Sequence, residues 1–277
     1  MSAVLDSGPA PAAVPALRRR PGSWGTGLAS VALCVLLWHV AATQRLHLGL
    51  VTFQNVPTPV AVAAAFGELL QSPKLLRHLG SSLQRIGWGF GLAALLGVSL
   101  GLAIGRLGGV RRSLLPPLEV LRPIPAVAWI PLSVLMFPSS EGSMVFITFV
   151  GALFPVLLAT LHGAEGVDAR LLASARSLGC TGWRLFGEVV LPAAAPSIVT
   201  GLAIGMGTCW FCLVSAEMIS GQFGIGYWTW ESYTVQNYAN IVVGMLLIGV
   251  LGMGSSALLR WLGRRAMPWY RPSGAPP

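Results

Sequence analysis

Residue types that commonly carry catalysis or bind metals are few in this sequence and lie far apart. The four histidines show no HExxH motif and no other ligand spacing. They are His39, His47, His78 and His162. The only aspartates are Asp6 and Asp168. The sequence therefore predicts no catalytic site, no metal site and no cofactor held by this chain.

Two of the four cysteines, Cys209 and Cys212, have the CxxC spacing of redox and metal sites. Such a site needs water access or further ligands, and both cysteines lie in an apolar run. We therefore interpret them as small apolar residues of a membrane helix. Cys34 lies in another apolar run and Cys180 in a polar segment, so the sequence indicates no disulfide framework.

The single lysine bears on the use of ATP. A P-loop needs a glycine-rich loop followed by Lys and Ser or Thr to hold the phosphates. Lys74 lies in the sequence Ser-Pro-Lys-Leu, so it cannot belong to such a loop. If the function of this chain uses ATP, a partner chain must hydrolyse it.

Three charged side chains lie within or beside apolar runs, where an ionised group normally faces a partner or a cavity. Glu119 and Arg122 are three residues apart and would share a helix face, which predicts either a mutual ion pair or an Arg122 that helps an anionic solute to pass. Glu217 either faces a translocation cavity or contacts Gln222 or Tyr227 at the membrane surface.

The composition indicates an all-α membrane protein. Of 277 residues, 54% are hydrophobic and only 10% are charged, whereas soluble domains carry about a quarter charged residues. The net charge of +9 is not typical of a nucleic-acid-binding protein here, because the arginines form short clusters between apolar runs. The expected surroundings are therefore a lipid bilayer, with no nucleic-acid partner.

About six apolar runs have a length suited to crossing a bilayer. They cover residues 24–43, 79–104, 114–137, 144–161, 197–219 and 241–259. About thirteen arginines fall in the segments that this topology places on one side, which predicts an inner-membrane protein with both termini in the cytoplasm. Between the first two runs, residues 61–70 are expected to form a short amphipathic helix at the outer interface.

These features divide the chain into expected regions. Residues 1–23 form a disordered basic tail, and 24–77 an anchor helix with an external linker. Residues 78–265 form a transmembrane domain with a cytoplasmic loop at 163–195, and 266–277 form a second tail.

Glycines and prolines indicate how the membrane helices are built. Gly97, Gly101 and Gly105, and likewise Gly201 and Gly205, recur every four residues, which predicts close helix packing. The third run holds five prolines and is expected to be kinked or broken. They are Pro116, Pro117, Pro123, Pro125 and Pro131. Such backbone either lines a solute pathway or bends for packing alone.

The polar loop carries the most informative pattern. Residues 173–179 read Ala-Ser-Ala-Arg-Ser-Leu-Gly, nine residues follow, and 189–192 read Val-Val-Leu-Pro. This resembles the coupling loop of bacterial binding-protein-dependent ABC permeases: Glu-Ala-Ala, three residues, Gly, nine residues, Ile-x-Leu-Pro. The matching positions are Ala175, Gly179, Val189, Leu191 and Pro192. Ala173 replaces the usual Glu, which leaves the carboxylates at 165, 168 and 188 as possible substitutes.

The loop also has a physical interpretation. A helix over residues 168–178 would present one face to a partner, Gly179 would turn the chain, and Pro192 would stop a second short helix. In the family this unit docks into a groove of the ATPase.

Other motifs extend the resemblance over about residues 78–265. Leu-Arg-Pro-Ile-Pro at 121–125, Trp-Ile-Pro-Leu at 129–132 and Ser-Ala-Glu-Met-Ile at 215–219 are similar to permeases of the nitrate/sulfonate/taurine (bicarbonate) group. The resemblance implies an ABC type I importer permease fold and a small anionic substrate. It also implies a second permease copy, two ABC ATPase subunits that use ATP, and an extracytoplasmic solute-binding protein. Candidate pathway residues are Arg122, Pro123, Pro125 and Glu217.

Two other functions remain open at this point. A secondary transporter or channel would need no ATPase, but such folds often contain internal repeats, and none is visible between the two halves. A membrane receptor or scaffold would have no evident use for a broken third span.

Overall fold

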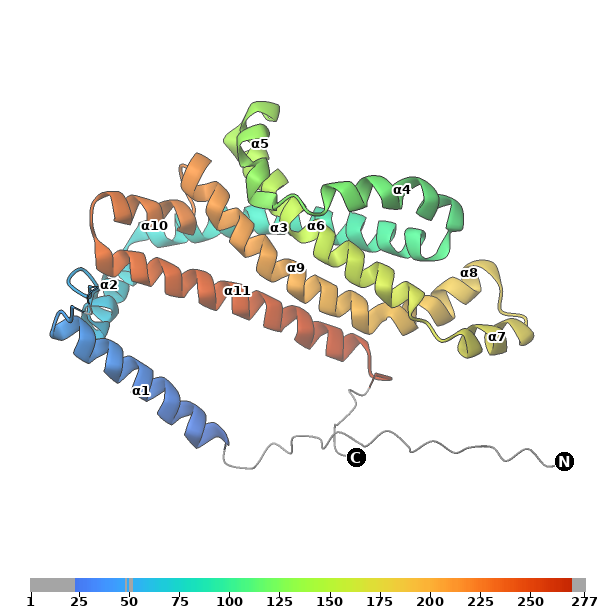
Figure 1. Cartoon of the computed structure of the whole chain (residues 1–277), viewed down its shortest axis with the longest axis horizontal. Coiled ribbons are helices and arrows are strands. Elements are labelled where there is room, and N and C mark those ends of the chain that lie inside the picture. Colours follow the sequence, from blue (N-terminus) through green and yellow to red (C-terminus); the bar gives the residue numbers. More distant parts are fainter. Residues whose placement is uncertain (1–22, 48, 50–51, 271–277) are drawn as a thin grey trace.

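The computed structural model describes residues 23–47, 49 and 52–270, and these are helical over most of their length (Figure 1). Within this part of the chain, extended pairing is limited to one bridge between His47 and Thr52. The elements are α1 (Ser23–Thr43), α2 (Pro59–Gln71), α3 (Pro73–Arg106), α4 (Gly108–Leu121), η1 (Ala126–Trp129), α5 (Ile130–Met136), α6 (Ser140–Glu165), α7 (Ala169–Ser177), α8 (Gly182–Leu185), η2 (Phe186–Val190), α9 (Leu191–Ser220), α10 (Ile225–Thr234) and α11 (Tyr238–Ala266). Most of the two predicted tails lies outside the described residues.

The expected all-α membrane fold is confirmed. Among the described residues, five helices are long and apolar enough to cross a bilayer, and a sixth crossing is counted if α4 and η1–α5 form one broken span. The helices extend beyond the predicted apolar runs because polar residues cap them. The side chains of Ser72, Ser139 and Asn237 accept backbone hydrogen bonds at the starts of α3, α6 and α11.

The third predicted span is broken, as the prolines indicated. α4 and the η1–α5 segment meet at an angle of 86°. Pro116 and Pro117 lie inside α4, and Pro131 lies in the first turn of α5. The break falls at residues 122–125, where Pro123 and Pro125 supply no backbone donor. The expected kink or break in the third run, 114–137, is therefore confirmed.

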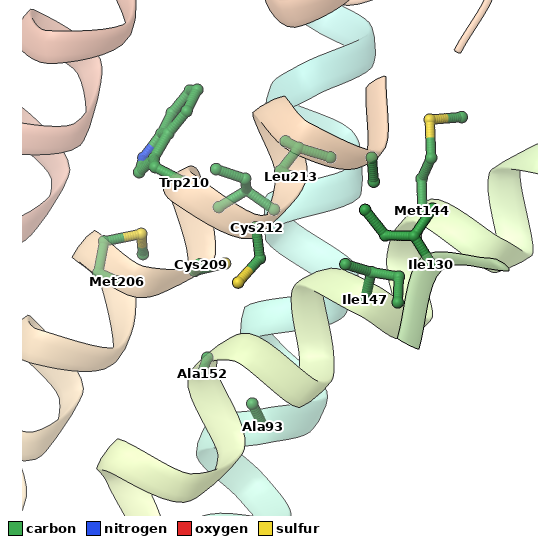
Figure 2. Packing of buried hydrophobic residues seen from close by; sticks show 12 residues of the cluster. Ala93, Ile130, Met144, Ile147, Ala152, Met206, Cys209, Trp210, Cys212 and Leu213 are labelled. Atoms are coloured by element: carbon green, nitrogen blue, oxygen red, sulfur yellow. The ribbon is translucent and has the colours of Figure 1, made fainter. Parts of the chain in front are cut away.

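The core forms where α6 lies between α3 and α9. A Cβ atom built on Gly97 or Gly101 of α3 would come within 3.0 Å of α6, and one on Gly205 of α9 would do so from the other side. The predicted glycine stripes are therefore the surfaces of close approach. Figure 2 shows the apolar cluster at this junction, with Cys209 and Cys212 of α9 among its buried members. Among the described residues no cluster suited to a metal ion is found.

The two ends of the bundle carry different elements (Figure 1). At one end α2 packs on α11 through Val62, Ala65 and Leu69, which confirms the short helix expected at 61–70. α10 lies at the same end against α9 and α11. The opposite end carries α7 and α8 and, from the arginine distribution, faces the cytoplasm.

Candidate functional site

The cytoplasmic loop forms a helix and a turn whose ends are set by local sequence. Asp168 caps α7, because its Oδ1 atom accepts a hydrogen bond of 2.8 Å from the amide of Arg170. At the other end Gly179 has φ +80°, in the left-handed region. The Gly179 amide donates to Arg176 O and the Cys180 amide to Ala175 O. This pair of bonds is a Schellman motif, and it ends the helix where the sequence predicted.

The second half of the loop differs from the expectation. Pro192 was expected to stop a short helix before the next span. Instead α8, η2 and α9 form one apolar helical stretch, Gly182–Ser220. The π-turn η2 precedes Pro192, and the Leu191 amide donates to Phe186 O. Pro192 lies in the first turn of α9 and has no backbone N–H. Because the π-turn η2 has already shifted the backbone hydrogen bonds there, the helix continues through Pro192.

The loop exposes large apolar side chains. Leu178 and Trp183 are each 86% exposed, and Leu171 is also exposed. Neither α7 nor α8 contains a buried residue. Of the positions that match the coupling pattern, Ala173, Gly179 and Leu191 are exposed, whereas Ala175, Val189 and Pro192 are half-buried. The exposed apolar side chains form a surface suited to a protein partner.

The three carboxylates considered as substitutes for the missing Glu are each engaged locally. Glu165 pairs with Arg111 of α4, and Asp168 caps α7. Glu188 lies 3.5 Å from Arg184 on the next helical turn. Each therefore stabilises the shape of the loop region in this chain.

The break between α4 and α5 leaves its side chains exposed. Arg122, Pro123 and Pro125 are exposed, as is Glu119. Among the described residues Glu119 and Arg122 form no ion pair with each other, contrary to the first of the two predicted alternatives. Arg122 is the C-cap of α4 and keeps helical dihedrals, but both side chains are exposed and do not come within ion-pair distance of each other. In this single chain the Arg122 guanidinium is therefore open to an outside group.

Glu217 is completely buried and belongs to a cluster of charged and polar groups near the outer end of the bundle. Its Oε1 atom accepts 2.8 Å hydrogen bonds from Arg85 Nη1 and Ser82 Oγ, and its Oε2 atom accepts one of 2.9 Å from the Gly226 amide. The expected contacts with Gln222 or Tyr227 are replaced by these. Because the carboxylate is enclosed by protein, it faces no open passage in this conformation.

Arg85 joins three helices through the same cluster. It binds Glu141 at the start of α6 with two hydrogen bonds, of 2.8 and 2.5 Å, while also binding Glu217 of α9. Its Nη1 atom also donates to Phe223 O at 2.6 Å. The side chain of Arg85 is 2% exposed and that of Glu141 is 66% exposed. The cluster therefore holds the ends of α6 and α9 against α3.

The turn before α10 is built onto this cluster. The Ile225 amide donates to Ser82 Oγ, and the Nδ1 atom of His78 lies within 3.1 Å of both the amide and the carbonyl of Gly224. Gly224 has φ +131°, and a Cβ atom there would overlap the Glu217 carboxylate. Only glycine fits this position without displacing the ion pair.

Comparison with known proteins identifies the family of this chain. The family described as "Binding-protein-dependent transport system inner membrane component" matches residues 93–271. The match covers more than half of the chain, including the cytoplasmic loop, the α4–α5 break and Glu217. The chain belongs to this family.

Relatives of this permease carry names from one group of transporters. It is 34% identical to SsuC of Bacillus subtilis, which is named for aliphatic sulfonate transport, over 92% of both chains. It is 32% identical to the nitrate import permease NrtB of Leptolyngbya laminosa over 70% of both chains. It is also 32% identical to the bicarbonate transport permease CmpB of Synechococcus elongatus over 66% of both. The chain is thus a multi-pass inner-membrane permease subunit of an ABC importer.

Sequence reasoning missed the central residue of the buried cluster in this permease. Arg85 was not among the candidate residues. His78, Ser82 and Arg85 follow each other at spacings of four and three, so they share one face of α3. A polar stripe at helical spacing inside an apolar run was the signal that could have indicated a buried network.

Proposed function

We propose that this permease imports a small anion, and that a separate ABC ATPase drives it through the loop between α6 and α9. The observation that carries the proposal is the exposed apolar surface of Leu171, Leu178 and Trp183 on that loop. Large apolar side chains outside the bilayer are stabilised by burial against a protein. An ATPase groove would supply that burial.

The proposed transmission of force follows from the connections of the loop. α6 runs without interruption to Glu165, three residues before the Asp168 cap of α7. On the other side α8 and η2 continue into α9. A displacement of α7 and α8 by a partner would therefore move the inner ends of two packed membrane helices together. Alternating access requires such rigid connections between the cytoplasmic loop and the membrane helices.

We assign the solute pathway to the break between α4 and α5. Arg122 offers a positive charge with no ion-pair partner among the described residues, and Pro123 and Pro125 keep the backbone irregular beside it. An unpaired guanidinium suits an anion such as nitrate, bicarbonate or a sulfonate. The relatives named for such anions support this substrate class. Glu217 is assigned to the structural cluster rather than to the pathway.

The working unit is proposed to contain two copies of this chain, two ATPase subunits and an extracytoplasmic solute-binding protein. The exposed side chains at the α4–α5 break support the second copy, because irregular backbone at membrane depth must be covered by protein or line an aqueous cavity. A partner copy facing this break would enclose the pathway.

Transport in proteoliposomes tests the proposal. The permease is reconstituted with the ATPase and the solute-binding protein, and uptake of nitrate, bicarbonate, taurine and an alkyl sulfonate is measured. Uptake of at least one anion should require ATP and stop with a hydrolysis-deficient ATPase. Arg122→Gln should reduce it, whereas Arg112→Gln, an exposed arginine of α4 outside the break, should not. Uptake that continues without the ATPase would instead indicate a secondary transporter or channel.

A further inference from the structure

A cavity of about 740 Å³ lies between the inner end of α3 and the cytoplasmic loop. Leu102 and Leu107 line it from α3 and its end, Leu185 and Phe186 line it from the loop, and the mostly exposed Trp183 only borders it. Two arginines, Arg106 and Arg176, complete the lining together with Ser99 and further apolar or small residues, and none of the lining residues is acidic. The cavity is therefore apolar along its walls and positively charged at its inner end.

Arg106 is the unusual member of this lining. Its Nε and Nη2 atoms are buried, and among the described residues they have no hydrogen-bond partner. The charge of Arg176 acts on Arg106 across the cavity, which adds repulsion to the missing hydrogen bonds. By contrast, Arg111 and Arg184 on neighbouring elements each pair with a glutamate of this chain. Buried guanidinium donors left unpaired are costly, so the site calls for an anionic group.

The walls and the position of the cavity indicate which chemical groups the ligand contains besides its anionic group. Arg106 is the last residue of a helix that is long and apolar enough to cross a bilayer, and it follows directly on the apolar run 79–104. Its guanidinium is therefore expected near the lipid phosphates. A small anion would satisfy the two arginines but would leave the apolar walls facing water. An acyl chain would cover those walls. Basic pockets at the cytoplasmic ends of membrane helices suit anionic lipid headgroups.

We propose that this cavity binds one anionic phospholipid, whose phosphate accepts hydrogen bonds from Arg106 and Arg176 and whose acyl chain lies along α3 and Phe186. The lipid joins the end of α3 to the loop, since the two arginines come from these two elements. The site extends the proposed function to a dependence on membrane composition, but the binding itself requires neither an ATPase nor a transported solute.

Lipid binding to the purified full-length permease tests this inference. Phosphatidylglycerol and phosphatidylcholine are titrated separately into the detergent-solubilised protein, and bound lipid is counted by native mass spectrometry. One phosphatidylglycerol should bind more tightly than phosphatidylcholine. Arg106→Gln should weaken it about tenfold, the effect of losing a charged hydrogen bond to phosphate. Arg112→Gln is the matched control, because Arg112 is exposed on α4 and does not line the cavity.

Arg176→Gln provides a second variant that does not disturb the core, because Arg176 is exposed on α7. It should also weaken phosphatidylglycerol binding, whereas inorganic phosphate at equal concentration should not displace the lipid. Equal binding of the two lipids, or no change in both arginine variants, would overturn the proposal. So would displacement by phosphate alone, which would indicate a simple anion site. If Arg106→Gln weakened only ATPase association, the guanidinium would belong to that interface and the lipid site would be refuted.

Discussion

Replacing Arg85 by methionine should destabilise the permease, because it leaves the buried carboxylate of Glu217 without a charged partner. Methionine retains much of the length and apolar volume of the arginine stem but removes the guanidinium. Glu217, which is completely buried, would keep its hydrogen bonds from Ser82 and Gly226 and lose its only charged partner in the described chain. Glu141 would lose the same partner, but its side chain is 66% exposed and water can solvate it.

The expected magnitudes follow from these different exposures. Removing one member of a buried ion pair costs about 3–5 kcal/mol, so Arg85→Met should lower the free energy of unfolding by that amount. Breaking the exposed half with Glu141→Gln should cost about 1 kcal/mol or less. The double variant Arg85→Met/Glu217→Met removes both buried charges. It also removes the hydrogen bonds that Ser82 and Gly226 donate to Glu217, at a cost of about 1 kcal/mol each. It should therefore be more stable than Arg85→Met alone.

Unfolding in mixed micelles measures these differences. The purified variants are titrated with SDS, and loss of helix is followed by circular dichroism. The order of stability should be wild type, Glu141→Gln, the double variant, then Arg85→Met. Equal losses for Arg85→Met and Glu141→Gln, or a double variant that is no more stable than Arg85→Met, would refute the assignment of the buried pair as the source of stability.

Three further substitutions test other parts of the structure. Gly179→Ala places a side chain at φ +80° and should destabilise the turn by about 1 kcal/mol. ATP-driven uptake should therefore fall, whereas the control Gly187→Ala, in the helical η2, should leave uptake unchanged. Equal uptake by the two variants would contradict the role of the turn. Gly224→Ala should lower stability to SDS by about 2 kcal/mol or more because its Cβ overlaps the Glu217 carboxylate; an unchanged titration midpoint would show that the turn adapts. Leu178→Asp places a charge on the exposed loop surface and should weaken ATPase association at least about tenfold in a pull-down with purified subunits; undiminished association would exclude this surface.

Local patterns in the sequence were sufficient for the spans and the loop helix. Hydropathy located the membrane helices because a bilayer demands long apolar runs, and Gly179 marked the end of α7 because a left-handed residue closes a Schellman turn. Close packing at Gly97 and Gly201 was likewise visible as a four-residue repeat. Each of these signals lies within a few turns of one helix.

The parts that sequence reasoning missed depend on partners far apart in the chain. Arg85 and Glu217 are 132 residues apart, and nothing in either neighbourhood indicates the other. The continuation of the helix through Pro192 depends on the π-turn before it, which no composition signal predicts. The prolines predicted a break in the third span, but two of them fit inside α4, so their number alone could not locate it.

Site-directed labelling of the loop tests the central claim most directly. Ala173 is exposed on α7, so Ala173→Cys in a Cys180→Ser background places a reactive thiol on the cytoplasmic loop that is proposed to contact the ATPase. A membrane-impermeant maleimide should label it in inside-out vesicles only, and added ATPase should protect it from labelling. Labelling from the outer side of intact cells, or undiminished labelling under saturating ATPase, would contradict the account.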